Sequence, residues 1–372
     1  MRRLFQLPAL IATCALVLFA LPTALYAGGD TSAGAVYTMT NAPSGNAVAV
    51  FSRSKDGSLT PAGTFPTGGA GTGGGLGNQG GLVLDRHDHW LFAVNPGSDD
   101  LSVFAVHESG LVLTDKQPTG GATPISVSVH RDLVYVLNAG SDTVSGLRVT
   151  HDGKLQPIAD STRALSGSGT DAAQLSFSTD GEQLVVTEKA TSKILIYPVH
   201  ENGLLGAATV YLSPTPTPFG FAFGKHDQFF VSEAAGGLPG LSSVSSYQLD
   251  QGGIAHLVTT SAMTHQTAAC WVAVTNNGRF AYTSNTGSGT LSGFAIRPDG
   301  RLELLDADGK TADTGAGSAP IDLALSRNSR FLYSLNAGNG TLSAFRVGKG
   351  GSLSPVATLP GIPAGANGLA AR

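Results

Sequence analysis

Three acidic residues are candidates for acid–base chemistry: Glu188, Glu233 and Asp322. When two carboxylates lie close together, one has a raised pKa and can serve as a general acid or base. The same carboxylates could instead bind a cation or a basic ligand, and solvated acids at the surface are the simpler alternative. His265 is the histidine that we would test as a further base. We therefore predict Glu188, Glu233, Asp322 and His265 as catalytic candidates.

Amide and aromatic side chains supply candidates for ligand binding. Amide groups can hold the oxyanion that forms when a carbonyl is attacked, and a Trp ring offers a flat apolar face to a ligand. The candidates are Asn95, Asn138, Gln174, Trp271, Asn285 and Asn336. Plainer explanations stay open, because Asn before Ala-Gly or Thr-Gly suits a turn and Trp271 can form a wall of a channel.

A repeated phrase indicates which elements position these residues. Residues 133–155 read LVYVLNAGSDTVSGLRVTHDGKL, which predicts a strand, a turn, a second strand and a second turn. Variants of the phrase recur at residues 90–111, 183–204, 280–302 and 331–353. With a further strand before and after each pair, the pattern gives four strands per repeat and seven repeats. This is typical of an all-β, seven-bladed β-propeller with four antiparallel strands per blade.

The two ends of the chain fit a closed ring. The mature chain starts on a second strand near Val36 and finishes on a first strand at residues 368–372. We therefore expect one blade to be shared between N-terminal and C-terminal strands, which would remove the open edges of the ring.

In such a ring, the start of the innermost strand and the end of the next strand lie on the same face. Two sets of side chains are therefore expected to converge on one rim of the central channel. The residues at strand starts are Gly81, Ser126, Gln174, Gly220, Trp271, Asp322 and Asn367. The residues at strand ends are Asn41, Asn95, Asn138, Glu188, Glu233, Asn285 and Asn336.

Residues 1–27 have the pattern of a secretory signal peptide. Arg2 and Arg3 precede an apolar stretch without acids, and Ala27 precedes a plausible cleavage point. An uncleaved anchor and a lipoprotein with Cys14 are the alternatives. We expect residues 28–372 to form a single propeller domain, secreted or periplasmic.

Composition limits the partners. The chain has 372 residues, of which 50 are Gly and 13% are charged, and its net charge is −4. Removing the signal peptide changes the net charge to −6, because two Arg leave with it. The absence of a basic run argues against nucleic acid and, after cleavage, against a membrane as partner. We expect a monomer whose partner is a small molecule or a protein, with no cofactor and no metal.

The segment Pro66–Gly81 reads PTGGAGTGGGLGNQGG and has few side chains that could pack. Such a composition favours plain flexibility, with a mobile flap over one face of the ring as the alternative.

The repeats resemble the lactonase-type seven-bladed propellers, which include 6-phosphogluconolactonase and carboxymuconate cyclase-like proteins. The resemblance rests on the phrase at residues 331–338, FLYSLNAG, and on the turn at residues 299–302, DGRL. It implies hydrolysis or isomerisation of a lactone-type sugar acid at the rim. Active members share a Gly-Pro-Arg-His motif, which corresponds here to Ala268-Ala269-Cys270-Trp271, while Asp322 fits an acidic position that they share. The second hypothesis is a non-catalytic propeller that binds a ligand or protein on the same rim.

Overall fold

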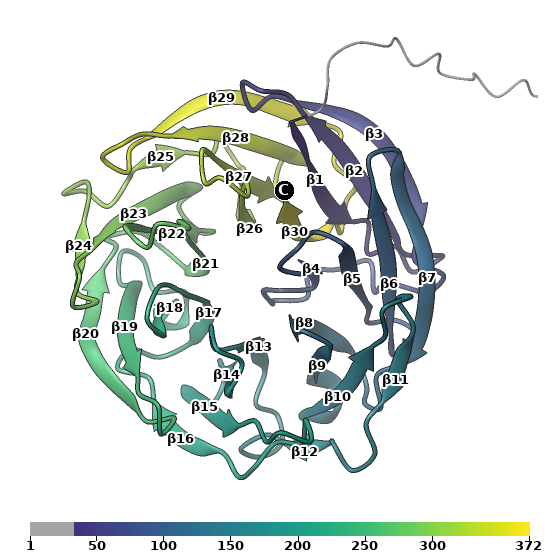
Figure 1. Ribbon diagram of the computed structural model, residues 1–372. Helices are drawn as coiled ribbons and strands as arrows, with labels where there is room; N and C mark the ends of the chain where they lie inside the picture. The colour runs from purple at the N-terminus through teal and green to yellow at the C-terminus, as the bar shows by residue number, and fades with distance from the viewer. Residues whose placement is uncertain (1–32) are drawn as a thin grey trace, which may run out of the picture. The chain divides into compact units, whose positions relative to one another are not determined.

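The structure, a computed structural model, describes residues 33–372. Its strands form seven antiparallel sheets arranged as a ring around a central channel (Figure 1). The signal peptide interpreted at residues 1–27 lies outside the described residues. The predicted all-β, seven-bladed propeller is confirmed.

Each sheet runs from an inner strand at the channel to an outer strand at the periphery. The first three complete sheets contain β4 (Leu82–Leu84), β5 (Trp90–Asn95), β6 (Asp100–His107) and β7 (Gly110–Pro118); β8 (Pro124–His130), β9 (Leu133–Asn138), β10 (Thr143–Val149), β11 (Leu155–Pro157) and β12 (Arg163–Ala164); and β13 (Ala172–Phe177), β14 (Gln183–Glu188), β15 (Lys193–Pro198) and β16 (Thr209–Leu212). The next three contain β17 (Pro218–Phe223), β18 (Gln228–Glu233), β19 (Ser243–Leu249) and β20 (Ala255–Met263); β21 (Ala269–Val274), β22 (Phe280–Asn285), β23 (Thr290–Ile296), β24 (Leu302–Leu304) and β25 (Ala312–Asp313); and β26 (Pro320–Leu325), β27 (Phe331–Asn336), β28 (Thr341–Val347) and β29 (Leu353–Pro360).

The seventh sheet joins the two ends of the described chain. It contains β1 (Gly34–Met39), β2 (Ala47–Arg53) and β3 (Leu59–Pro66), with the C-terminal β30 (Asn367–Ala371) as its inner strand. β30 pairs antiparallel with β1, and the hydroxyl of Thr38 donates to the carbonyl of Gly368 at 2.7 Å. The predicted closure is confirmed, and it removes the free edges that an open sheet would leave.

Burial explains the sequence pattern of the strands. The second strand of most sheets is buried at every residue, as in β9, β14 and β27, because other strands cover its edges and neighbouring sheets cover its faces. The outer strands consist largely of half-buried and exposed residues, as in β3. Continuous apolar runs therefore mark the inner part of each blade, while more polar, partly exposed strands mark its periphery.

Buried tyrosines connect neighbouring sheets in a repeated manner. The hydroxyl of Tyr135 donates to the carbonyl of Gly203 at 2.9 Å, and Tyr333 makes the equivalent bond to Gly57 at 3.0 Å. Each acceptor is a turn glycine with positive φ, a backbone conformation that glycine adopts without strain. Burial raises the pKa of Tyr135 to about 12, so these hydroxyls stay protonated donors at neutral pH.

Two single-turn 3-10 segments, η1 (Ala139–Ser141) and η2 (Ala235–Gly237), follow the second strands of their sheets. Within residues 33–372, no helix is long and apolar enough to cross a membrane.

Candidate functional site

The two ends of the central channel differ. We call the end at which the inner strands begin the loop end, because the segment 67–81 packs there. We call the opposite end the turn end, because the turns between the inner and second strands line it. The rim predicted from the sequence is the loop end.

The glycine-rich segment is held at the loop end by backbone and side-chain hydrogen bonds. The amide of Gly73 donates to the carbonyl of Asn41 at 2.8 Å, and the side chain of Asn41 donates to Gly74 at 2.7 Å. Further along, the amide of Gln79 donates to the carbonyl of Ala173 at 3.1 Å. The expectation of plain flexibility is therefore wrong. Small residues let this backbone approach its neighbours, and its polar groups are paired across the ring.

Gln79 extends from this segment to the opposite side of the channel. Its side-chain nitrogen donates to the carbonyl of Val272 at 2.8 Å, and its oxygen accepts from the amide of Val272 at 2.9 Å. The predicted ligand-binding residue Gln174 makes the same pair of bonds to Phe221, at 3.0 and 2.7 Å. Both side-chain amides are thus engaged with the backbone of inner strands, Gln79 across the channel and Gln174 on the neighbouring strand.

Asp322 lies in β26 and lines a channel cavity of about 270 Å³ beneath the glycine-rich segment, together with Gln79 and Gln174. Its side chain is buried, and it accepts hydrogen bonds from the backbone amides of Leu323 and Leu369. Burial raises the pKa of Asp322 well above its ordinary value, and the two amides lower it only in part. Within the described residues, no cation pairs with this carboxyl. A buried carboxyl without a cation is a candidate acid or base.

Glu188 and Glu233 do not line this cavity. Both are fully buried. Glu233 accepts hydrogen bonds from hydroxyl groups that include Ser213 at 2.8 Å, Ser243 at 2.6 Å and Ser245 at 2.9 Å. Glu188 accepts from the amide and hydroxyl of Ser166, at 2.9 and 2.6 Å. The structure therefore does not bring the three carboxylates into one pocket, because hydroxyl groups near the ends of neighbouring strands bind two of them.

The four predicted asparagines occupy the same kind of position as these glutamates. Asn95, Asn138, Asn285 and Asn336 are fully buried at the ends of second strands. Each donates from its side chain to a Ser hydroxyl seven residues along, at 2.8 to 2.9 Å. Their side chains join adjacent strands inside the sheets, and none of the four lines the cavity beside Asp322.

The remaining two predictions fall in different environments. Trp271 is buried, packs against Phe219 with ring centroids 4.8 Å apart and ring planes tilted by 54°, and donates from its indole nitrogen to the carbonyl of Asn78 at 2.7 Å. It therefore supports the glycine-rich segment. His265 is exposed on the connection between β20 and β21, with a φ of 55°, and does not line the channel cavity.

Sequence reasoning missed Lys189, which follows Glu188 directly. Its side chain is mostly buried, its ammonium donates to the carbonyl of Gly77 at 2.5 Å, and it lies 3.2 Å from Asp171. Burial lowers the pKa of Lys189, an effect that Asp171 opposes. Burial also raises the pKa of Cys270 to about 12, so this thiol stays protonated. No local pattern could have found the contact with Gly77, because the two residues lie 112 positions apart.

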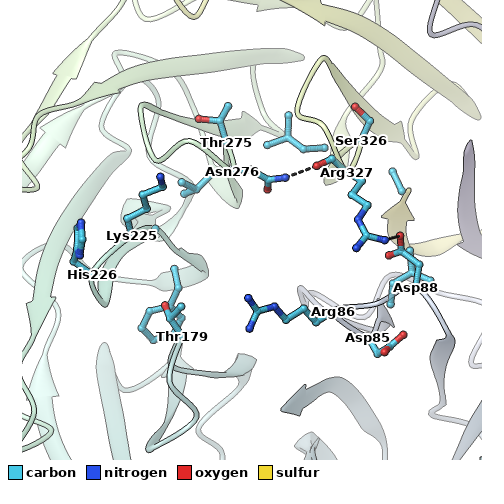
Figure 2. Close-up of a pocket in the computed structure, with 16 residues that line it drawn as sticks. Asp85, Arg86, Asp88, Thr179, Lys225, His226, Thr275, Asn276, Ser326 and Arg327 are labelled. Atoms are coloured by element: carbon cyan, nitrogen blue, oxygen red, sulfur yellow. Dashed lines mark hydrogen bonds and ion pairs between the residues drawn. The ribbon is translucent and has the colours of Figure 1, made fainter. Parts of the chain in front are cut away.

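The turn end is open. A cavity of about 820 Å³ lies there between the turns, and several charged side chains surround it (Figure 2). This cavity shares Leu84 and Ala371 in its walls with the cavity beside Asp322, so the two follow one another along the channel. Among residues 33–372, no cluster of three or more His, Cys, Asp or Glu side chains could hold a metal ion.

Comparison with known proteins fits this architecture. The chain matches the family "Lactonase, 7-bladed beta-propeller" over residues 35–168 and 241–365. A relative from Lactococcus lactis subsp. lactis, described as the uncharacterized protein YwcC, is 26% identical over 293 residues, which cover 73% of this chain and 82% of that protein.

Two solved structures show the same fold. A putative 6-phosphogluconolactonase from Bacteroides fragilis is 16% identical, with a TM-score of 0.74 over 93% of this chain and 99% of its own. The periplasmic gluconolactonase PpgL from Pseudomonas aeruginosa is 19% identical, with a TM-score of 0.72 over 89% of this chain and 98% of its own. Because the family model matches more than half of its residues, the chain belongs to the lactonase family of seven-bladed β-propellers.

Proposed function

We propose that the protein hydrolyses a small lactone of a sugar acid inside its channel, with Asp322 as the general base. The observation that carries the proposal is a buried carboxyl, without a cationic partner, that lines a cavity of about 270 Å³. Ionising such a group is unfavourable, so a purely structural position would be filled more easily by a neutral residue. Family membership and the gluconolactonase neighbours point to lactones as the substrate class.

In the proposed reaction, Asp322 takes a proton from a water molecule that attacks the lactone carbonyl. The tetrahedral intermediate then collapses, the ring C–O bond breaks, and the leaving alkoxide takes up the proton. The product is the open-chain sugar acid. Because the base must be ionised, and burial raises the pKa of Asp322, activity should increase as the pH rises toward and through that raised pKa.

The cavity beside Asp322 adjoins the open turn end, while the segment 67–81 packs at the loop end. We infer that substrate enters from the turn end. This route differs from the rim that the sequence suggested.

The test is a hydrolysis assay of the mature protein on glucono-lactone and 6-phosphogluconolactone, with spontaneous hydrolysis subtracted. Asp322→Asn should reduce kcat at least about 100-fold, the usual contribution of a general base. Asp160→Asn is the matched control, because Asp160 is exposed and lies outside the cavity. Equal rates for Asp322→Asn and the unchanged protein would refute the assignment.

A non-catalytic, ligand-binding propeller is the second candidate function. The side-chain amides of Gln79 and Gln174 favour it. Because both are already hydrogen-bonded to backbone groups, they leave few free donors beside Asp322. In this case the assay would show no turnover by the unchanged protein, while the same lactones or their acids would still bind saturably.

We further propose that the protein acts outside the cytoplasm, since residues 1–27 have the pattern of a signal peptide. Expression with the complete leader, followed by N-terminal sequencing of the exported protein, tests this. A new N-terminus at Gly28 is expected, and full-length protein kept in the cytoplasm would contradict export.

A further inference from the structure

The large cavity at the turn end is surrounded by cationic side chains. Three turns of the ring contribute Arg86, Lys225 and Arg327 to its lining, and His226 lies next to Lys225 in the same turn. Figure 2 shows Arg86 reaching toward the middle of the hollow and Arg327 held at its edge by Asp88. The cavity of about 820 Å³ is large enough for a small organic molecule.

Two of these cations have no anionic partner among the described residues. Arg86 and Lys225 are exposed to the cavity and form no ion pair in residues 33–372. Arg327 is different, because its guanidinium contacts Asp88 at 2.5 Å and its carbonyl accepts from the side chain of Asn276. The wall therefore combines one oriented arginine with two cations that remain free to bind.

The nearby carboxylates leave an excess of positive charge. Asp88 is paired with Arg327, and Asp85 accepts hydrogen bonds from the amides of His89 and Trp90 at 2.6 and 2.7 Å. Three cationic side chains thus face the hollow against two carboxylates, of which Asp88 neutralises Arg327 and Asp85 binds backbone amides. This is unusual for a chain whose net charge is −4. Like charges gathered around one concave surface repel each other until an anion enters.

We propose that the turn end is a binding site for a small organic anion, held through a carboxylate or phosphate group by Arg86 and Lys225. Arg327, held by Asp88, lines the edge of the hollow. Arginine binds such oxyanions through two parallel hydrogen bonds, and lysine acts as a mobile point charge. The site is separate from Asp322 and does not require hydrolysis there.

The experiment is calorimetric titration of the mature protein with gluconate, glucose 6-phosphate and glucose. Gluconate carries the carboxylate, glucose 6-phosphate carries the phosphate, and glucose is the neutral polyol control. At least one anion should bind saturably, at least 10-fold tighter than glucose and more weakly at higher salt. Absence of anion binding up to about 10 mM, or equal binding of glucose, would overturn the proposal.

Variants locate the site. Arg86→Gln combined with Lys225→Gln should weaken anion binding at least 10-fold, because both direct contacts are lost. Lys55→Gln is the matched control, since it removes one positive charge from an exposed position outside the cavity. Asp322→Asn should leave anion binding within two-fold, which separates this proposal from the hydrolysis proposal. A double variant that binds the anion as well as the unchanged protein would overturn the site, and so would loss of binding in Asp322→Asn.

Discussion

The two ends of one channel have been built in different ways from the same repeat. At the loop end, the glycine-rich segment fills the space with paired backbone groups and joins sheets on opposite sides through Gln79. At the turn end, equivalent short turns leave a hollow of about 820 Å³ and project cations into it. The repeat thus determines where a site can lie, while departures from the repeat decide which end is open.

Substitutions in the segment 67–81 are expected to have the largest effect on stability. Gly71 lies so close to Asn41 that an added Cβ would overlap its carbonyl group, whereas Gly74 has nothing within 4 Å of such an atom. Gly71→Ala should therefore destabilise the protein by about 2–3 kcal/mol, the upper part of the usual range for overpacking. Gly74→Ala should stay within about 0.5 kcal/mol. Urea unfolding of both variants measures this, and equal stabilities would mean that the segment is not packed.

Gln79 gives a somewhat smaller effect at the same end. Gln79→Ala leaves the amide and carbonyl of Val272 without their partner, and an unpaired buried polar group costs about 1–3 kcal/mol. Gln174→Ala is the matched comparison, because Gln174 makes the same two bonds from a strand rather than from the segment. We expect both losses in urea unfolding. A loss for Gln174→Ala alone would show that Gln79 is not held across the channel.

The smallest expected effect is a gain in stability on replacing Asp322 with Asn, and the size of this gain should depend on pH. Because the pKa of Asp322 is raised in the folded state, the folded protein keeps the proton up to a higher pH than the unfolded chain does. Stability is therefore lost as the pH rises from the ordinary Asp pKa toward the raised value. Asn cannot ionise, so Asp322→Asn should raise Tm by about 1–4 °C at pH 7 and by less at pH 4. Thermal unfolding between pH 4 and 8 measures the difference, and a difference that does not change with pH would contradict the raised pKa.

The fold was predictable because its information is local. Alternating apolar runs and turn residues recur through the chain, so the strands, the seven blades and the closure by β30 follow from the pattern alone. One outer strand departs from the repeat: β16 begins only at Thr209, and an isolated bridge between Val199 and Leu205 precedes it.

The site was less predictable because its contacts are distant in sequence. Glu233 looks like a departure from the asparagine pattern, yet it binds hydroxyls of neighbouring strands much as asparagine does. Arg86 and Lys225 each lie in what looks like an ordinary exposed turn. Only the closed ring places these turns around one hollow. A different residue type at a repeated position is therefore weak grounds for a different role.

The central claim is that the segment 67–81 closes the loop end of the channel. Backbone hydrogen–deuterium exchange across these residues tests it most directly, because it distinguishes a packed segment from a mobile one. The amides of Gly71, Gly73 and Gln79 donate to carbonyl groups of the ring. We predict that peptides containing these amides exchange far more slowly than an unstructured peptide, at rates near those of the inner strands. Exchange at the unstructured rate throughout 67–81 would contradict the account, because the channel would then be open at both ends.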